Sequence, residues 1–164
     1  MIQLRSPEPD DLDFLYQIEN DVENWAVSNT RSTYSKQQLL DLILSSHNPY
    51  DAGQCRFMVT KADETIGTVD LFDFDPFHGN GAVGIFIKEE YRQKGNALKA
   101  LKRFLYLCKK SFGMNSVLAQ IDMQNVGSLK LFESAGFEKI GELKNWRRVV
   151  GEERKSNGLF QIIL

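Results

Sequence analysis

The strongest structural signal in the sequence is one amphipathic helix near the middle of the chain. Its apolar residues recur at helical spacing and form one stripe, made of Ala97, Leu98, Leu101, Phe104, Leu105, Cys108 and Phe112. Such a stripe is typical of a helix that buries one side against another layer of structure. Gly113 follows directly and predicts the end of the helix. The rest of the chain must therefore supply an apolar surface for this helix.

Both strands and helices are expected around it. Alternating apolar positions predict strands at Ile2–Leu4, Phe57–Val59, Ile66–Leu71, Val83–Lys88, Val117–Ile121, Phe137–Trp146 and Leu159–Leu164. Helical spacing predicts helices at Leu15–Trp25, at Leu39–Leu44 after the capping box Ser35–Gln38, and at Asn125–Ala135. Turns are expected at Ala62–Glu64 and Gly79–Gly81. The order β-α-α-β-β-β-α-β-α-β-β predicts an α/β fold with a mixed sheet.

Length and charge limit the class of protein. The 164 residues fit one domain spanning 1–164. The 20 basic and 22 acidic residues give a net charge of −2, which argues against a general nucleic-acid binder. The first residues lack the pattern of a secretion signal, and no apolar run approaches the ~20 residues that span a bilayer. We therefore expect a cytoplasmic protein with neither a nucleic-acid nor a membrane partner.

The cysteines and histidines do not suggest a metal site. Cys55, Cys108, His47 and His78 are scattered and lack the ligand spacing of a zinc centre. Cys108 lies on the apolar stripe of the long helix, which favours a place in the core over thiol chemistry. No metal is expected.

The segment before the long helix carries the clearest functional signal. The strand Val83–Lys88 leads into Arg92-Gln93-Lys94-Gly95-Asn96-Ala97, and this loop opens the helix. The first N–H groups of a helix have no partners within the helix and lie at the positive end of its dipole, so they bind phosphates well. Gly95 lets the backbone approach such a group closely. The alternative is an ordinary turn decorated with basic residues.

Two motifs in this order resemble the GNAT superfamily of N-acyltransferases. Arg92-x-x-Gly95-x-Ala97 resembles its pyrophosphate-binding motif, and Asn125–Phe137 resembles a second family segment that runs from an Asn to a Gly-Phe pair. The chain is most similar to the branch of ribosomal-protein N-terminal and spermidine/spermine acetyltransferases. The resemblance implies a splayed sheet that holds coenzyme A between its fourth and fifth strands.

The resemblance also implies the residues that would bind acetyl-CoA, the expected cosubstrate. Strand backbone would pair with the pantetheine arm, loop amides would hold the pyrophosphate, and an Asn and a Lys would contact the arm and the adenosine end. These residues are Ile85, Phe86 and Ile87 on the strand, Arg92, Gln93, Lys94, Gly95, Asn96 and Ala97 in the loop, and Asn125 and Lys130 beyond it.

On the acceptor side, the resemblance implies direct attack of a primary amine on the thioester. Because such an amine has a pKa of ~10.4, it must lose a proton before it attacks. Asp70 and Asp73 match acceptor-side acids of the polyamine branch. Glu19, Asp21 and Glu23 form a further acidic group near Trp25, from which Glu23 and Trp25 are taken as candidate binding residues. For these acidic residues, the alternative is an ordinary solvated position on the protein surface.

Two positions depart from the family pattern. Phe132 stands where many relatives carry the Tyr that protonates the departing thiolate, so Ser128, one turn earlier, is the candidate acid. Ala82 stands where many relatives have a Glu, which shifts the expected base to Asp70 and Asp73.

Several alternatives stay open. The acceptor could be a polyamine, another small amine or a protein N-terminal amine. A coenzyme-A-binding module with degenerate catalysis is the main rival, whereas a dinucleotide-binding fold would place its glycine loop after the first strand. The apolar strand Leu159–Leu164 could pair within the sheet or across a homodimer.

Overall fold

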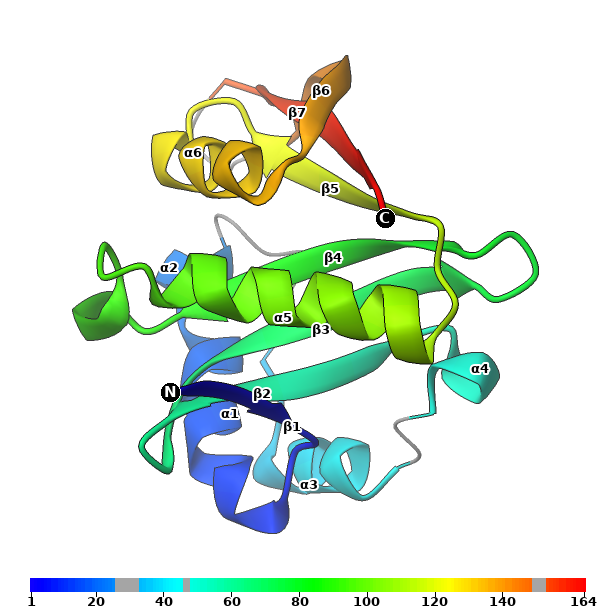
Figure 1. Ribbon diagram of the computed structural model, residues 1–164. Helices are drawn as coiled ribbons and strands as arrows, with labels where there is room; N and C mark the ends of the chain where they lie inside the picture. The colour runs from blue at the N-terminus through cyan, green and yellow to red at the C-terminus, as the bar shows by residue number, and fades with distance from the viewer. Residues whose placement is uncertain (26–32, 46–47, 149–152) are drawn as a thin grey trace.

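The computed structural model describes residues 1–25, 33–45, 48–148 and 153–164 of the chain. Their strands form a seven-stranded sheet in the order β1-β2-β3-β4-β5-β7-β6, shown in Figure 1. Neighbouring strands are antiparallel except β4 and β5, which run parallel, so the predicted mixed sheet is confirmed. The strands are β1 (Ile2–Arg5), β2 (Cys55–Lys61), β3 (Glu64–Asp75), β4 (Asn80–Ile87), β5 (Ser116–Asp122), β6 (Glu138–Arg147) and β7 (Lys155–Ile163).

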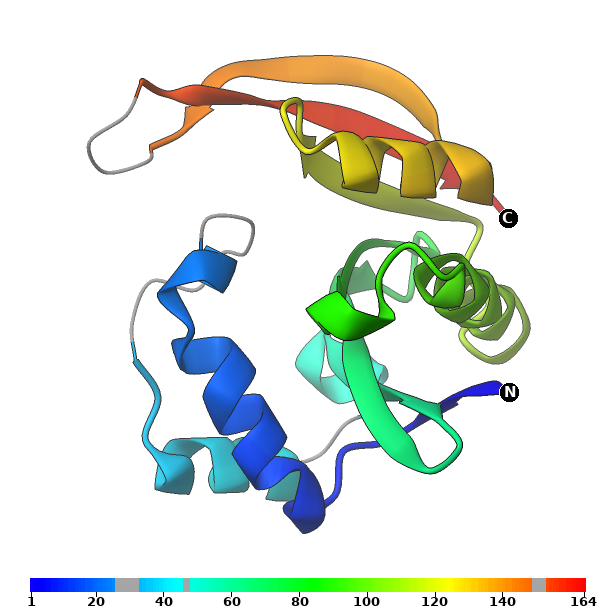
Figure 2. The ribbon, with the colours of Figure 1, turned by 90° about the vertical axis from the view of Figure 1, so that its left-hand side faces the viewer.

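Helices cover both faces of the sheet, as Figure 2 shows. The long helix α5 (Asn96–Ser111) lies along one face and packs beside α6 (Val126–Ala135). On the opposite face lie α1 (Leu12–Asn20) and α3 (Lys36–Leu44). Shorter helical segments are η1 (Pro9–Asp11), α2 (Val22–Trp25), α4 (Pro49–Ala52) and η2 (Glu89–Tyr91).

Local signals in the sequence account for several element ends. The Ser35 hydroxyl accepts a hydrogen bond from the Gln38 N–H, and the Gln38 side chain bonds back to the Ser35 N–H, so the predicted capping box is confirmed. The turn between β2 and β3 places Ala62 and Asp63 at positive φ. Gly113, at φ +63, follows the end of α5.

Three local expectations are wrong in detail. The first predicted helix breaks at Asp21, whose extended backbone separates α1 from α2. The turn predicted at Gly79–Gly81 lies earlier, because the Asp75 carboxylate accepts hydrogen bonds from the backbone N–H groups of Phe77 and His78, and Asn80 is already in β4. The short helix α4 was not predicted; Asn48 caps it and Pro49 occupies its first position.

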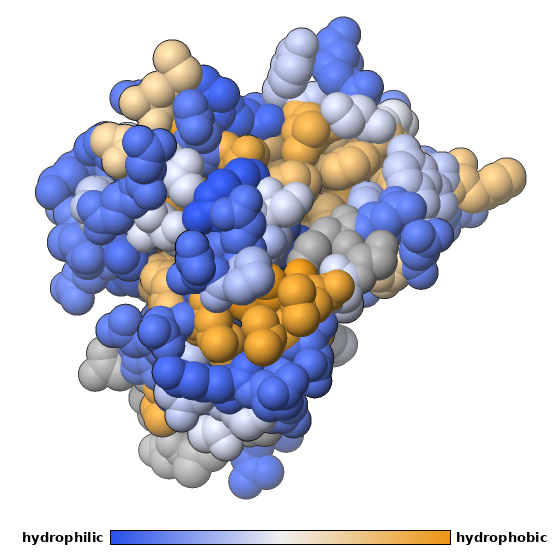
Figure 3. Space-filling model, turned by 90° about the horizontal axis from the view of Figure 1, so that it is seen from below, coloured by the Kyte–Doolittle hydropathy of each residue, from blue (hydrophilic) through white to orange (hydrophobic). Residues whose placement is uncertain are grey.

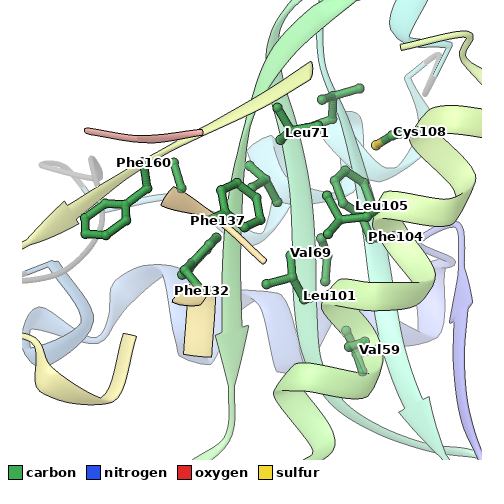
Figure 4. Packing of buried hydrophobic residues seen from close by; sticks show 14 of the residues in the cluster. Val59, Val69, Leu71, Leu101, Phe104, Leu105, Cys108, Phe132, Phe137 and Phe160 are labelled. Carbon is green, nitrogen blue, oxygen red and sulfur yellow. The ribbon is translucent and has the colours of Figure 1, made fainter. Parts of the chain in front are cut away.

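The main core lies between α5 and the sheet and continues beneath α6. Figure 4 shows its side chains converging from the helix and the strands. Leu101, Phe104 and Cys108 of α5 are fully buried, which confirms the predicted core position of Cys108. Burial raises the pKa of the Cys55 and Cys108 thiols to about 12, so both stay protonated and unreactive at neutral pH.

Side chains alternate between the two faces along β2. Val59 belongs to the core beneath α5, whereas Met58 packs with Leu15 of α1 and Leu39 of α3 in a second buried cluster. Because Arg56 is two residues from Met58, its side chain lies on the same face as α1.

The last strand lies inside the sheet, and some apolar residues are exposed on the surface. β7 pairs with β5 on one edge and β6 on the other, so the terminal strand is used within the sheet. Helix α3, at the bottom of Figure 1, exposes Leu42 and Leu44, and the underside in Figure 3 shows apolar atoms bordered by hydrophilic ones. Among the described residues, no helix combines the length and apolarity that crossing a membrane requires.

An ion pair between an arginine and an aspartate joins the start of α1 to the sheet. Arg5 of β1 donates hydrogen bonds of 2.6 and 2.8 Å to the two carboxylate oxygens of Asp11, which also accepts from Thr65 and from the Glu8 N–H. Burial would raise the pKa of Asp11, but these hydrogen bonds outweigh it and the pKa is lowered. The folded state therefore holds Asp11 ionised.

We expect Asp11→Asn to reduce the free energy of unfolding by about 2–4 kcal/mol, because it leaves the Arg5 guanidinium without its ionic partner. Since the folded pKa is the lower one, the stabilisation exists above the unfolded pKa of ~3.9 and is lost as the pH falls through the folded value. Asp11→Asn should therefore also flatten the acid limb of the stability profile. Asp10→Asn, at the neighbouring exposed position, is the control. Equal urea midpoints for the two variants would contradict this role.

Candidate active site

The sheet opens between its two parallel strands. β4 and β5 pair only over Asn80–Ala82 and Ser116–Leu118. Beyond this point β4 continues to Ile87 with β3 on its other edge, and β5 continues to Asp122 with β7 on its other edge. In the described part of the chain, the facing edges at 83–87 and 119–122 have no strand partner. The strand residues predicted to bind the cofactor, Ile85, Phe86 and Ile87, lie on this open edge.

The loop after β4 exposes backbone amides beside that edge. Gln93 and Gly95 have positive φ values of 57° and 72°, which fold the loop tightly before α5 begins at Asn96. A Cβ built on Gly95 would find no described atom within 4 Å. The N–H groups of Asn96, Ala97 and Leu98 lie in the first turn, where a helix supplies no partner. This arrangement can receive an anion at the helix N-terminus.

The polar side chains of this loop mainly hold its shape. Asn96 is only 4% exposed, and its amide donates to the Tyr91 carbonyl at 2.9 Å. The Arg92 Nε donates to the Ile87 carbonyl at 2.8 Å, and its guanidinium lies over the Phe86 ring. The Lys94 ammonium donates to the Glu90 carbonyl at 2.7 Å. The buried, structural role of the Asn96 side chain was not visible in the sequence.

The start of α6 carries the second group of predicted residues. The Asn125 side-chain oxygen accepts from the Ser128 N–H at 3.0 Å and caps the helix. Ser128 is half-buried, and Lys130 is exposed. Phe132 is 4% exposed and packs edge-to-face on Phe137, so it belongs to the core. The position at which the family resemblance implies a Tyr is therefore an apolar packing position.

The two predicted acceptor-side acids have different surroundings. Asp70 of β3 lies opposite Gly84 of β4, two residues beyond the last β4–β5 pair, and therefore beside the opening. Asp73 is exposed at φ +52, where the β3–β4 pairing is irregular, and it lies beside the closed part of the sheet. The structure does not bring these two carboxylates to one point.

Asp70 has a partner that the sequence did not reveal. The Arg56 Nε donates to Asp70 Oδ1 at 2.6 Å, Nη2 donates to Oδ2 at 3.3 Å, and Nη1 donates to Glu19 Oε1 of α1 at 2.6 Å. Burial opposes the charge of Arg56, but the two carboxylates outweigh it and raise its pKa. The available signal was the position of Arg56 next to the predicted start of β2, on the face opposite the core residues.

The remaining residues singled out in the sequence are Glu23, Trp25 and Ala82. Glu23 and Trp25 belong to α2, but their side chains lie outside the described residues. Ala82 pairs with Leu118 at the branch of the sheet and brings no charge to it. In the described part of the chain, no cluster of three or more His, Cys, Asp or Glu residues could hold a metal ion.

Comparisons with known proteins agree with this fold. A spermidine N-acetyltransferase from Vibrio cholerae, solved with CoA and spermine, superposes with a TM-score of 0.86 at 22% identity, over 99% of this chain and 95% of that one. An uncharacterized N-acetyltransferase, p20, of Bacillus licheniformis is 28% identical over 92% of this chain and 86% of its own length. The spermidine N(1)-acetyltransferase of Escherichia coli K12 is 24% identical over 94% and 82%.

The family follows from a match that covers most of the chain. The sequence model of the acetyltransferase (GNAT) domain matches residues 2–138, which is most of the chain. The chain therefore belongs to the GNAT family of N-acetyltransferases, enzymes that take their acetyl group from acetyl-CoA.

Proposed function

We propose that this chain transfers the acetyl group of acetyl-CoA to a primary amine of a small polycationic acceptor, a polyamine. The observation that carries this proposal is the pair of carboxylates, Asp70 and Glu19, that Arg56 bonds on the face opposite α5, with Asp70 opposite Gly84 of β4 beside the opening. The spermidine acetyltransferases among its relatives support the same class of acceptor.

The donor occupies the opening between β4 and β5. Its pantetheine arm pairs, as a further strand would, with the edge of Ile85–Ile87 that has no strand partner in the described part of the chain, and this contact polarises the acetyl carbonyl. The amides of Gln93–Ala97 hold the pyrophosphate at the start of α5. The Asn125 amide nitrogen contacts the arm, and Lys130 reaches the adenosine end. The unpaired edge and the open space beside Gly95 support these assignments.

The acceptor approaches from the face that carries α1. Glu19 and Asp70 attract its ammonium group, and the proton leaves through water beside Asp70 before the amine attacks the thioester. Asp73 lies in solvent farther along β3 and adds negative charge to the approach. The contributions of Glu23 and Trp25 stay predictions from the sequence.

The leaving thiolate takes its proton from Ser128 or from water. A thiol with a pKa of ~8.5 is a tolerable leaving group, so a weak acid is sufficient. The core position of Phe132 removes the hydroxyl that many relatives use, and this observation favours the second candidate, a coenzyme-A-binding module without turnover. A turnover assay distinguishes the active acetyltransferase from the binding module.

The first experiment tests the donor loop with matched glycine variants. Gly95 and Gly113 both have positive φ at opposite ends of α5, and a Cβ on either meets no described atom within 4 Å. Gly95→Ala and Gly113→Ala should therefore cost similar stability, about 1 kcal/mol. Only Gly95→Ala places a methyl group where the pyrophosphate binds. We expect it to weaken acetyl-CoA binding by calorimetry about tenfold, or ~1.4 kcal/mol. Equal affinities would remove the assignment.

The second experiment identifies the acceptor. Wild-type protein is assayed with linear polyamines, matched monoamines and peptides with a free N-terminus, and release of the CoA thiol is followed with a thiol reagent. The buried Cys55 and Cys108 thiols do not interfere in the folded protein. We expect kcat/KM for polyamines to exceed that for monoamines about tenfold, because the second cation interacts with the acidic side of the cleft. Acetyl-CoA binding without thiol release would establish the binding module instead.

The third experiment tests the proton donor. Ser128→Ala should lower kcat about ten- to hundredfold if the hydroxyl protonates the thiolate, with KM for acetyl-CoA little changed. Ser134→Ala, at an exposed position of the same helix, is the control for helix propensity. Full turnover by Ser128→Ala would assign the proton to water.

A further inference from the structure

Arg56 connects two carboxylates from different elements at the point where the sheet opens. Its fork of donors spans Asp70 on β3 and Glu19 on α1, with the side chains of all three residues largely buried, at 30%, 25% and 14% exposure. A planar guanidinium presents its donors in a fixed fork, whereas a lysine ammonium is a point charge with three rotatable donors. The two-point contact with Asp70 therefore depends on arginine.

The position of Glu19 shows that this link holds α1 in place. Glu19 lies in the last turn of α1, where the negative end of the helix dipole repels a carboxylate. The helix has no basic residue in its last turn to offset that repulsion. Arg56, from the sheet, provides the compensating charge at 2.6 Å. The end of α1 is thus tied to β2 by an interaction from outside the helix.

The sheet register places this link beside the part of β4 whose other edge has no strand partner in the described chain. Arg56, Asp70 and Gly84 lie abreast on β2, β3 and β4. Gly84 contributes no side chain, and the ring of Phe72 lies against it. Two features therefore lie beside the opening on this face. One is the Phe72 ring, and the other is the bonded group of Arg56, Glu19 and Asp70, whose net charge is −1.

We propose that Arg56 is a positioning residue of the acceptor cleft. It holds Glu19 and Asp70 as a fixed pair of anions, and it holds α1 against the sheet, so that one ammonium group of the acceptor binds next to the open edge. Arg56 itself touches neither the donor nor the reacting amine. This inference rests on the proposed function, because it explains how an acetyltransferase acting on polyamines would bind its cationic acceptor.

Substitutions of Arg56 test the proposal through the split between KM and kcat. Arg56→Met keeps the length of the side chain but removes the charge, and Arg56→Lys keeps the charge but not the two-sided geometry. We expect KM for the polyamine to rise at least about tenfold in Arg56→Met, or ~1.4 kcal/mol, and by less in Arg56→Lys. In both variants, kcat should change less than about threefold and KM for acetyl-CoA should be unchanged.

A second arginine bridge in the same chain supplies the matched control. Arg5→Met breaks the pair with Asp11 at the other end of α1 and leaves Glu19 and Asp70 with their partner, so it reports the combined effect of lost stability and a loosened start of α1. If Arg56→Met does not fold, Arg56→Lys carries the test. An acceptor KM that rises no more than in Arg5→Met, or a loss confined to kcat, would overturn the inference and leave the proposed function intact. Absence of turnover with every amine in wild-type protein would overturn both.

Discussion

Backbone hydrogen bonding is the constraint on which the rest of this structure depends. A strand inside a sheet normally satisfies its polar groups on both edges, and an unpaired edge invites a partner. β4 pairs with β3 along one edge, with one irregularity near Asp73, but its other edge has no strand partner beyond Ala82 in the described part of the chain. The rest of the site is arranged around that edge. The loop that follows β4 presents the first backbone N–H groups of α5 at the end of this edge. The charged side chains of Arg56, Asp70 and Glu19 lie on the face of the sheet opposite α5.

Packing of apolar side chains holds the two parts of the sheet apart at the opening. One apolar cluster runs from Phe104 of α5, beneath the first four strands, to Phe132 of α6 and Phe160 of β7. Because protein interiors are close-packed, these rings set the separation of the two parts of the sheet and resist its change. The Phe at position 132 thus supplies apolar surface for packing where many relatives have a hydroxyl.

Local features were predictable, and features that depend on sheet register were not. The capping box at Ser35, the cap at Asn125 and the loop glycine at position 95 each follow from a few adjacent residues, and the long helix follows from its apolar spacing. The bond between Arg56 and Asp70 requires the pairing of β2 with β3, and the bond to Glu19 requires α1 to pack on that face. Neither relation has a local signature. The placement of β7 between β5 and β6 is likewise a property of the assembled sheet.

Asn96 illustrates the same limit within a motif. Its position in the phosphate loop was evident, but the spacing of a motif does not show which side chains turn inward. The structure buries the Asn96 amide against the Tyr91 carbonyl, so its side chain maintains the loop while its backbone N–H stays available. A motif can therefore locate a binding loop without separating the residues that bind from those that hold its shape.

Helix α1 is fastened at both ends by arginines that belong to the sheet, Arg5 at its beginning and Arg56 at its end. Between them, the buried Leu15 anchors the middle of the helix, whereas Asp13 and Tyr16 face solvent. A charge lost from one partner of either bridge leaves the other partner half-buried and uncompensated. The two bridges therefore make positions distant in the chain epistatic. The exposed side of α1 is free to drift in sequence, whereas its fastened ends can change only together with the strands that hold them.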